Sequence, residues 1–369
     1  MLFISNLIAI YFLMKGMIYK ISFYLLLFFL GCKPNNNAKV TSDNPTPCPE
    51  NSKHPSKDLL GSLEGFDVQS DTTALIFQTG FEPGTKIINQ NKNDATIIGT
   101  DRTFKNWNNW KLHLERNPKI GYFNIQYQGG NANQRLAEIV PDPYDPNNNS
   151  LKFWIKEPNV DQDVGRVQAN IYNNKCIKKL DYSVRLLLPS EFNNVKKAPF
   201  RIKWLTLMEF WNNANWEAEP NQFRITVNLQ KSSKSTDSLR IGIRSQIRDH
   251  KLNKWKDPHV WDYMNSTFAV PVGKWMNIEV HFVEGDDTSG RFILSITPEG
   301  GSKSVIHDIT NFTHHPNDPN PDGLSHFNPM KLYTSKEVIE QVTSTGSLLN
   351  VYWDDFRLAI SPENIESSD

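Results

Sequence analysis

The chain has 369 residues, 38% hydrophobic and 11% aromatic, which is enough for one large hydrophobic core or two small ones. Its 40 basic and 40 acidic side chains cancel, so there is no global field to attract nucleic acid and we expect no nucleic-acid partner. The three cysteines, Cys32, Cys48 and Cys176, are too few for a disulfide scaffold or a cysteine-based zinc cluster.

The N-terminal segment, residues 1–31, is strongly apolar and is interrupted by Lys15 and Lys20. Each of its two apolar runs is shorter than the roughly 20 residues that a membrane-spanning helix needs. The second run follows the two lysines and ends at Gly31-Cys32, which is the layout of a secretory signal. An uncleaved hairpin or anchor helix is the alternative interpretation.

The Gly31-Cys32 pair resembles the lipobox of bacterial lipoproteins, in which the cysteine is acylated and becomes the mature N-terminus. The resemblance implies a signal peptide over 1–31, a lipid anchor on Cys32, and a place in the bacterial cell envelope at the periplasmic or surface face of the outer membrane. Residues 32–72 are polar and rich in Pro, Asn and Ser, so they are expected to form a flexible tether.

Residues 73–362 are predicted to form one all-β domain, followed by a short tail over 363–369. Apolar and polar residues alternate through this region, as in FRITVNLQ at Phe223–Gln230, and turn-forming clusters separate the segments. Many strands without interleaved helices indicate a sandwich of two antiparallel sheets. The expected strands are Ala74–Phe81, Tyr122–Tyr127, Leu151–Ile155, Arg166–Tyr172, Tyr182–Leu188, Ile202–Phe210, Phe223–Gln230, Leu239–Arg248, Met276–Val283, Arg291–Thr297, Lys331–Thr334 and Leu349–Ile360, with one helix at Lys336–Thr343.

The polar faces of three predicted strands carry Arg, Gln, Asn and Thr side chains rather than the Lys and Glu mixture of an ordinary solvated face. Planar amide and guanidinium groups are suited to binding sugar hydroxyls and carboxylates, and nearby aromatic side chains can stack on sugar rings. The pattern therefore predicts a polysaccharide groove; ordinary exposed strand residues are the alternative. The expected substrate-binding residues are Gln168, Asn170, Trp211, Arg224, Asn228, Arg244 and Lys331.

Several segments, taken in order, resemble the concanavalin A-like jelly-roll polysaccharide lyases of the heparin lyase I and glucuronan lyase type. They are GRVQANIY (165–172), LDYSVRLLLPSEF (180–192), VPVGKWMNIEVHFVEGD (270–286), GRFILSITPEGG (290–301) and MKLYTS (330–335). A final YWDDFRL (352–358) is common among jelly-roll glycan proteins. The resemblance implies a jelly roll that binds a polysaccharide, including uronic-acid polymers, and cleaves it by β-elimination.

In that family a tyrosine, or a histidine and tyrosine pair, moves the proton at C5 of a uronic acid while Arg, Gln or Asn neutralises the carboxylate. Carried over by motif, Arg166 and Gln168 would face the carboxylate and Tyr333 would carry the proton. The strand at 207–212 reads LMEFWN, so Glu209 or Trp211 stands where the family has histidine. This departure leaves either tyrosine-only chemistry, with Glu209 in the catalytic set, or a noncatalytic glycan-binding lipoprotein of a glycan-uptake system.

Two further alternatives come from carboxylates. Glu209, with Glu217 and Glu219, leaves open a divergent glycoside hydrolase, which needs two carboxylates across one bond. Glu82 and Asp354 lie near the first and last predicted strands, a pairing that carbohydrate-binding jelly rolls use for a structural Ca²⁺. A surface salt bridge, for example to Arg357, is the other interpretation. A structural or adhesion lipoprotein is the third function class.

Overall fold

The computed structural model describes residues 73–102, 109–213, 222–234, 238–249 and 251–361. The chain divides into Met1–Thr46 and Pro47–Asp369, and every described residue belongs to the second unit. The expected signal peptide, the lipidation site at Cys32, the tether and the tail lie outside the described residues. In the described part of the chain, no helix combines the length and hydropathy that are needed to cross a bilayer.

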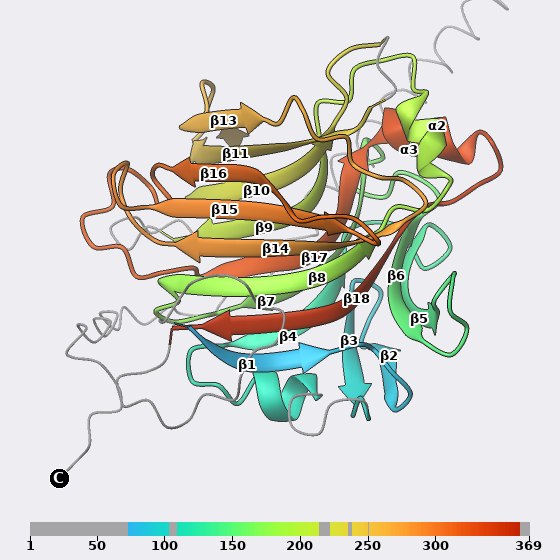
Figure 1. Ribbon diagram of the computed structural model, residues 1–369, viewed down its shortest axis with the longest axis horizontal. Coiled ribbons are helices and arrows are strands. Elements are labelled where there is room, and N and C mark those ends of the chain that lie inside the picture. Colours follow the sequence, from blue (N-terminus) through green and yellow to red (C-terminus); the bar gives the residue numbers. More distant parts are fainter. Residues whose placement is uncertain (1–72, 103–108, 214–221, 235–237, 250, 362–369) are drawn as a thin grey trace, which may run out of the picture. The chain divides into compact units, whose positions relative to one another are not determined.

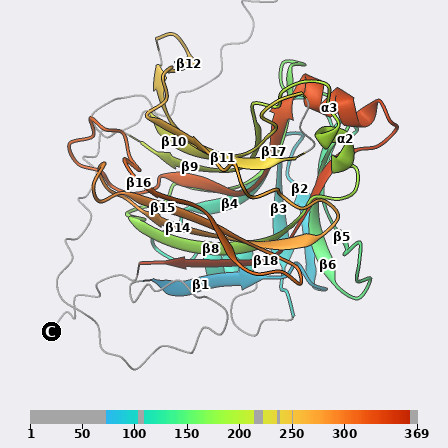
Figure 2. The ribbon, with the colours of Figure 1, turned by 45° about the horizontal axis from the view of Figure 1, so that its top comes forward.

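The described residues form two antiparallel sheets that pack face to face (Figures 1 and 2), so the predicted two-sheet sandwich is confirmed. The eight-stranded sheet runs in the order β16 (Ser304–Thr310), β15 (Arg291–Pro298), β14 (Trp275–Val283), β8 (Lys179–Leu187), β18 (Leu349–Ile360), β6 (Asn149–Ile155) and β5 (Arg135–Pro141), with β1 (Ala74–Thr79) also pairing with β18. The ten-stranded sheet runs in the order β12 (Lys254–Trp255), β11 (Arg240–Asp249), β10 (Phe223–Gln230), β9 (Leu205–Asn212), β17 (His326–Ser335), β7 (Val164–Tyr172), β4 (Tyr122–Tyr127), β3 (Asp94–Gly99) and β2 (Thr85–Asn89), with β13 (Trp261–Met264) pairing with β11.

Short helical segments join the strands at the ends of the sandwich. They are the π-helical turn η1 (Trp110–Leu114), α2 (Phe192–Lys196) and α3 (Lys336–Thr343), the last with the bounds predicted from the sequence. Helix α3 lies over β7, where Gly165 has no side chain: a Cβ built there would lie 2.7 Å from Ile339 Cδ1. A glycine in β7 therefore allows the helix to pack closely on the sheet.

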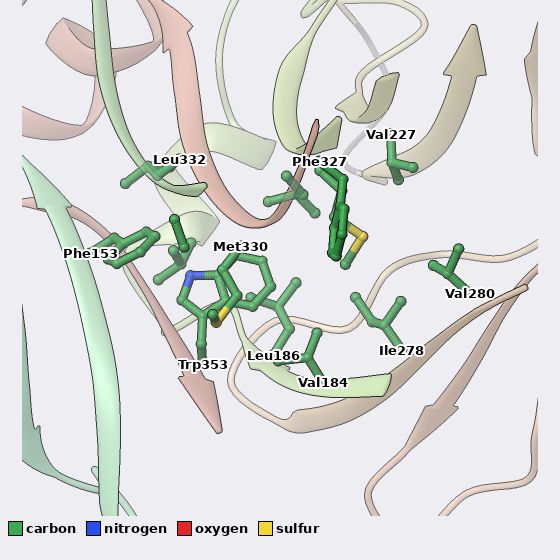
Figure 3. Close-up of a cluster of buried hydrophobic side chains, with 14 of the residues drawn as sticks. Phe153, Val184, Leu186, Val227, Ile278, Val280, Phe327, Met330, Leu332 and Trp353 are labelled. Atoms are coloured by element: carbon green, nitrogen blue, oxygen red, sulfur yellow. The ribbon is translucent and has the colours of Figure 1, made fainter. Parts of the chain in front are cut away.

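The core lies between the two sheets because each strand turns its apolar side chains to the same side. Figure 3 shows Phe327 and Leu332 of β17 pointing toward Val184 of β8, Ile278 of β14 and Trp353 of β18, on the opposite sheet. The remaining, polar face of the ten-stranded sheet points away from the core. We call it the polar face; it holds the candidate site.

Several predicted strands have different bounds in the structure. The strand expected at Ile202–Phe210 begins at Leu205, and Ile202 makes only an isolated bridge with Lys231. The strand expected at Lys331–Thr334 is much longer, His326–Ser335, and contains a register shift between Phe327 and Met330. The strands β2, β3, β5, β12, β13 and β16 were not expected from the sequence, because they are short or their apolar and polar residues do not alternate as regularly.

Candidate glycan-binding face

An amide network covers the part of the polar face formed by β4, β7 and β17. Gln168 Nε2 donates to Gln126 Oε1 at 3.0 Å and to Asn170 Oδ1 at 2.8 Å. Asn170 Nδ2 donates to Asn124 Oδ1 at 2.7 Å, and Asn328 Nδ2 donates to Asn170 Oδ1 at 2.5 Å. Because each amide holds its neighbour, the network fixes donors and acceptors in defined directions before any ligand binds.

A buried group of charges lies next to this network, where β9, β10 and β17 meet. Lys331 Nζ donates to Glu209 Oε2 at 2.5 Å, and Arg224 Nη1 donates to Glu209 Oε1 at 3.2 Å. The side chains of Glu209 and Lys331 are each only 1% exposed. Burial alone would raise the pKa of Glu209, but the charges of Lys331 and Arg224 hold it below its usual range. Glu209 therefore stays ionised.

Tyr333 and Arg166 extend this group along β17 and β7, where they are cross-strand partners. The Arg166 guanidinium lies 5.0 Å from the centre of the Tyr333 ring, and Lys331 Nζ lies 5.1 Å from the same centre. Burial raises the pKa of Tyr333, although the charge of Arg166 opposes this shift. Burial lowers the pKa of Lys331 to about 7, against the opposite effect of Glu209. An amine and a phenol whose pKa values are shifted in opposite directions thus lie side by side. We call Arg166, Glu209, Arg224, Lys331 and Tyr333 the charged centre.

Planar side chains gather at the end of β9. The Trp211 ring stacks on His326 of β17, with 4.9 Å between ring centroids and 19° between planes. Trp255 of β12 lies 5.5 Å from Trp211, and the Arg224 guanidinium lies 3.7 Å from the Trp255 ring centre. Burial lowers the pKa of His326 to about 3, so its imidazole is neutral at neutral pH. The family's strand histidine is thus absent from β9, but a neutral histidine from β17 lies against Trp211.

Five buried polar atoms on the polar face have no hydrogen-bond partner among the described residues. They are Arg166 Nε, Gln168 Oε1, Trp211 Nε1, Arg240 Nη1 and Arg244 Nε. They come from three strands, β7, β9 and β11. A buried polar atom without a partner costs about 1–3 kcal/mol. Ten further atoms of this kind lie elsewhere in the described residues, so the candidate site is defined by the amide network and the charged centre rather than by these atoms.

The ten catalytic and substrate-binding residues expected from the sequence all lie on the polar face. Asn228 accepts a hydrogen bond from Thr206 Oγ1 at 2.7 Å, and Arg244 pairs with Asp262 at 3.5 Å. The catalytic and binding roles assigned to the ten residues stay predictions. Glu217 and Glu219, on which a hydrolase would depend, lie outside the described residues.

Of the two residues expected to bind calcium, Asp354 lies in β18 of the eight-stranded sheet, and Glu82 lies between β1 and β2, where its Oε1 accepts a hydrogen bond from Asn149 N at 3.4 Å. Asp354 accepts a hydrogen bond from Asn148 Nδ2 at 2.9 Å, and Arg185 Nη1 lies 3.4 Å from Asp354 and 3.5 Å from Asp355. Within the described ranges, no three Asp, Glu, His or Cys side chains are grouped so that they could hold a metal ion. Asp354 and Asp355 pair with Arg185 rather than with Arg357. The calcium site expected from the sequence stays a prediction.

Sequence reasoning did not select Asn124, Gln126, Tyr172, His326 or Asn328 as site residues, although all five lie on the polar face. For β4 the signal was present, because YFNIQY alternates and its polar residues lie beside those of β7. For His326 and Asn328 the signal was hidden, because Pro329 and the register shift interrupt the alternation of β17.

Comparison with models of known protein families finds no match, and neither does comparison with curated proteins. Solved structures do match. An alginate lyase from Aplysia kurodai gives a TM-score of 0.40 at 11% identity, covering 61% of this chain and 87% of that one. An endo-β-1,4-glucuronan lyase from Trichoderma reesei gives 0.38 at 13% identity, covering 64% and 94%.

The lumenal domain of VIP36, bound to Ca²⁺ and Man3GlcNAc, gives a TM-score of 0.34 at 10% identity, covering 67% of this chain and 87% of that one. At such identities the likeness shows the fold alone: two antiparallel sheets in a concanavalin A-like sandwich, which polysaccharide lyases and lectins share. What this chain does must therefore be argued from its own site.

Proposed function

We propose that the polar face binds an acidic polysaccharide. The observation that carries the proposal is the excess of positive charge in the charged centre, where Arg166, Arg224 and Lys331 surround the single carboxylate of Glu209. Guanidinium and ammonium groups suit the carboxylates of an acidic chain. The fixed amide network beside them supplies further groups for sugar hydroxyls at little entropic cost.

We infer that the charged centre cleaves the chain by β-elimination at a uronic acid. Arg166 would neutralise the uronate carboxylate, which acidifies the hydrogen at C5. Lys331, with its lowered pKa, would accept that proton as the C4–O4 bond breaks and the C4=C5 double bond forms. Tyr333 would donate its proton to the leaving oxygen. The raised pKa of Tyr333 favours this donor role over the proton-abstracting role expected from the sequence.

A second candidate, binding without cleavage, is favoured by one contact. Lys331 is held by Glu209 at 2.5 Å, and an ion-paired ammonium is a hydrogen-bond donor rather than a base. In that case the same face would hold uronate chains for other proteins, and Tyr333 would only pack against Arg166.

Incubation with a panel of uronic-acid polymers tests the proposal. Cleavage would produce the ultraviolet absorbance of an unsaturated uronate, and Tyr333→Phe or Lys331→Ala would lower its rate by roughly 100-fold or more. Tyr263→Phe, an exposed tyrosine on β13 of the same sheet, is the matched control. Retention of the polymers without absorbance would select the binding candidate. If no polymer is either cleaved or retained, the polysaccharide proposal fails.

We also propose export and lipid anchoring at Cys32. The lysines before the apolar run and the Gly31-Cys32 pair support it, and so does Cys176, which is disulfide-bonded. Disulfides persist mainly in oxidising compartments outside the cytosol. Labelled fatty acid should enter the wild-type protein in a bacterial host but not Cys32→Ser. Labelling of both proteins alike would contradict acylation at this cysteine.

A further inference from the structure

A line of planar side chains crosses the polar face from β4 to β10 at one end of the strands. Cross-strand pairing places Tyr122 opposite Tyr172, Tyr172 opposite His326, His326 opposite Trp211, and Trp211 opposite Arg224. Trp255 of β12 extends the line beyond Arg224. We call these six residues the planar strip.

Contacts along the planar strip are close. The ring centroids of Tyr122 and Tyr172 are 3.5 Å apart, and the Arg224 guanidinium lies 5.4 Å from the Trp211 ring centre. Tyr122 is 40% exposed, and Tyr172, Trp211 and Trp255 are half-buried, so each ring keeps accessible surface. The strip is therefore not part of the core, where aromatic rings are fully covered.

The planar strip shares Arg224 with the charged centre, but its rings are separate from the reacting groups there, Arg166, Lys331 and Tyr333. Its Trp211–His326 pair lies two residues along the strands from the Glu209–Asn328 pair, which is roughly 7 Å at the rise of a β-strand. Tyr172 lies six residues along β7 from Arg166, which corresponds to roughly 20 Å. A sugar above Tyr333 and Arg166 would therefore not touch the strip.

The chemistry of the strip points to sugar rings. Flat faces with polar edges bind ligands that are apolar on one side and hydrogen-bonding at the rim, as a pyranose is. The hydroxyl of Tyr122, a residue that is 40% exposed, supplies such a polar edge. His326, kept neutral by burial, presents an uncharged ring in the middle of the line.

We propose that the planar strip is a second glycan subsite, on which successive pyranose rings stack as a polysaccharide crosses the strands from β4 toward β12. This inference rests on the proposed function, because it assumes a polysaccharide on the polar face. The strip adds affinity for long chains and takes no part in proton transfer. Its rings recognise the face of a sugar whatever charge that sugar carries.

Affinity measured with the intact polymer and with a disaccharide of the same sugar tests the strip. Trp255→Ala and Tyr122→Ala, at its two ends, should each weaken polymer binding by about threefold to tenfold, the range expected for one aromatic stacking contact. The affinity for the disaccharide should fall less, because a disaccharide can occupy the charged centre alone. Tyr144→Ala, with a tyrosine that is 56% exposed outside the ten-stranded sheet, is the matched control and should bind the polymer like wild type.

Each result decides the inference. If wild type binds the polymer but both strip variants bind it equally well, the strip is not a subsite, and the proposed function stands. An equal loss for polymer and disaccharide would also overturn the strip as a separate subsite. If wild type binds no polymer at all, the proposed function and the strip fail together.

Discussion

Lys331 and Glu209 form an ion pair in which both side chains are almost fully buried. Removing two charges from water costs several kcal/mol per ion, and their mutual attraction offsets this only in part, so such a pair is weak evidence for stability. Arg166 and Arg224 lie nearby and add positive charge, which makes the site still more costly to bury. The burial of this pair is consistent with the proposed role of the amine in proton transfer, because shifted pKa values are common at functional sites.

The role of Glu209 can be tested through the pH profile of cleavage. In Glu209→Gln the negative charge beside Lys331 is lost, so the pKa of the amine, already lowered by burial, falls further. Lys331 must be neutral to accept a proton, and therefore the acidic limb of the profile should move to lower pH by about one to three pH units. Glu279→Gln removes a buried carboxylate from β14 of the other sheet and should leave the limb in place. A limb that moves to higher pH would contradict the assignment of Lys331 as base.

Individual site residues were predictable from the sequence only where alternation was regular. Arg166, Gln168 and Asn170 follow each other at every second position of β7, so their common face could be derived from the period of a strand. The pairing of Lys331 with Glu209 could not be derived from the sequence, because it depends on which strands are neighbours in the sheet. Burial of the pair, which gives the site its pKa shifts, is a property of the folded sheet alone.

Irregularities in two neighbouring strands, β9 and β17, shape the charged centre. β17 shifts register between Phe327 and Met330, and β9 shifts against β10 next to Met208. Both shifts lie beside the Glu209–Lys331 contact. A bulge changes the direction of the following side chains, and such bulges are common next to functional sites. Pro329, which cannot donate to the ladder, stands within the shift of β17.

The segment that leads into β17 is held by Glu284, which follows β14. Gly323 N donates to Glu284 Oε1 at 2.9 Å, and Asn212 Nδ2 donates to the same oxygen at 2.8 Å. Burial raises the pKa of Glu284 to about 8; Asp318 and Asp322 act in the same direction, while Lys178 and the Gly323 hydrogen bond oppose it. Glu284 therefore ties the end of β9 to the start of β17, and its burial favours the protonated form.

Glu284→Gln tests this connection through the pH dependence of stability. The raised folded pKa means that Glu284 contributes stability below its unfolded pKa, and that this contribution is lost as pH rises through about 8. Glutamine keeps the accepting oxygen and does not ionise, so the variant should lose less stability than wild type between about pH 5 and pH 9, by roughly 1–3 kcal/mol after allowance for partial exposure.

Urea unfolding of both proteins at the two pH values measures this difference. The other titrating groups are common to both and cancel in the comparison. Asp287→Asn, at an exposed position close to Glu284 in sequence, is the control and should follow the wild-type curve. Equal losses for wild type and Glu284→Gln would show that Glu284 is not buried as a protonated side chain.

For the whole molecule, the sandwich was predictable because its central strands alternate strictly. β4, β10, β18 and helix α3 have the bounds expected from the sequence. The unexpected strands include the edges β16, β5 and β2, where one neighbour is missing and the sequence is less constrained. The order of strands within each sheet could not be predicted from the sequence either, because non-local pairs such as β7 with β17 depend on long-range packing.

Within one strand of the sandwich, alternate residues serve the core and the polar face. Two adjacent residues of β9, Phe210 and Trp211, can therefore separate an effect on stability from an effect on binding. Phe210 is fully buried, with ring centroids 5.2 Å from Phe292 and 6.3 Å from Phe282 of the opposite sheet, whereas Trp211 lies on the polar face. Phe210→Ala should cost about 3–5 kcal/mol in unfolding free energy, because it leaves a cavity where the two sheets meet.

Trp211→Ala should cost clearly less in unfolding free energy, because its half-buried ring leaves no closed cavity, yet it should weaken polysaccharide binding more than Phe210→Ala does. Chemical denaturation gives the first quantity and polymer binding, measured well below the unfolding transition, gives the second. Since the two residues are neighbours, a general disturbance of β9 would change both quantities in both variants. Such parallel losses would mean that the two faces of the ten-stranded sheet are not independent and that the polar face cannot be treated as a site carried by a separate core.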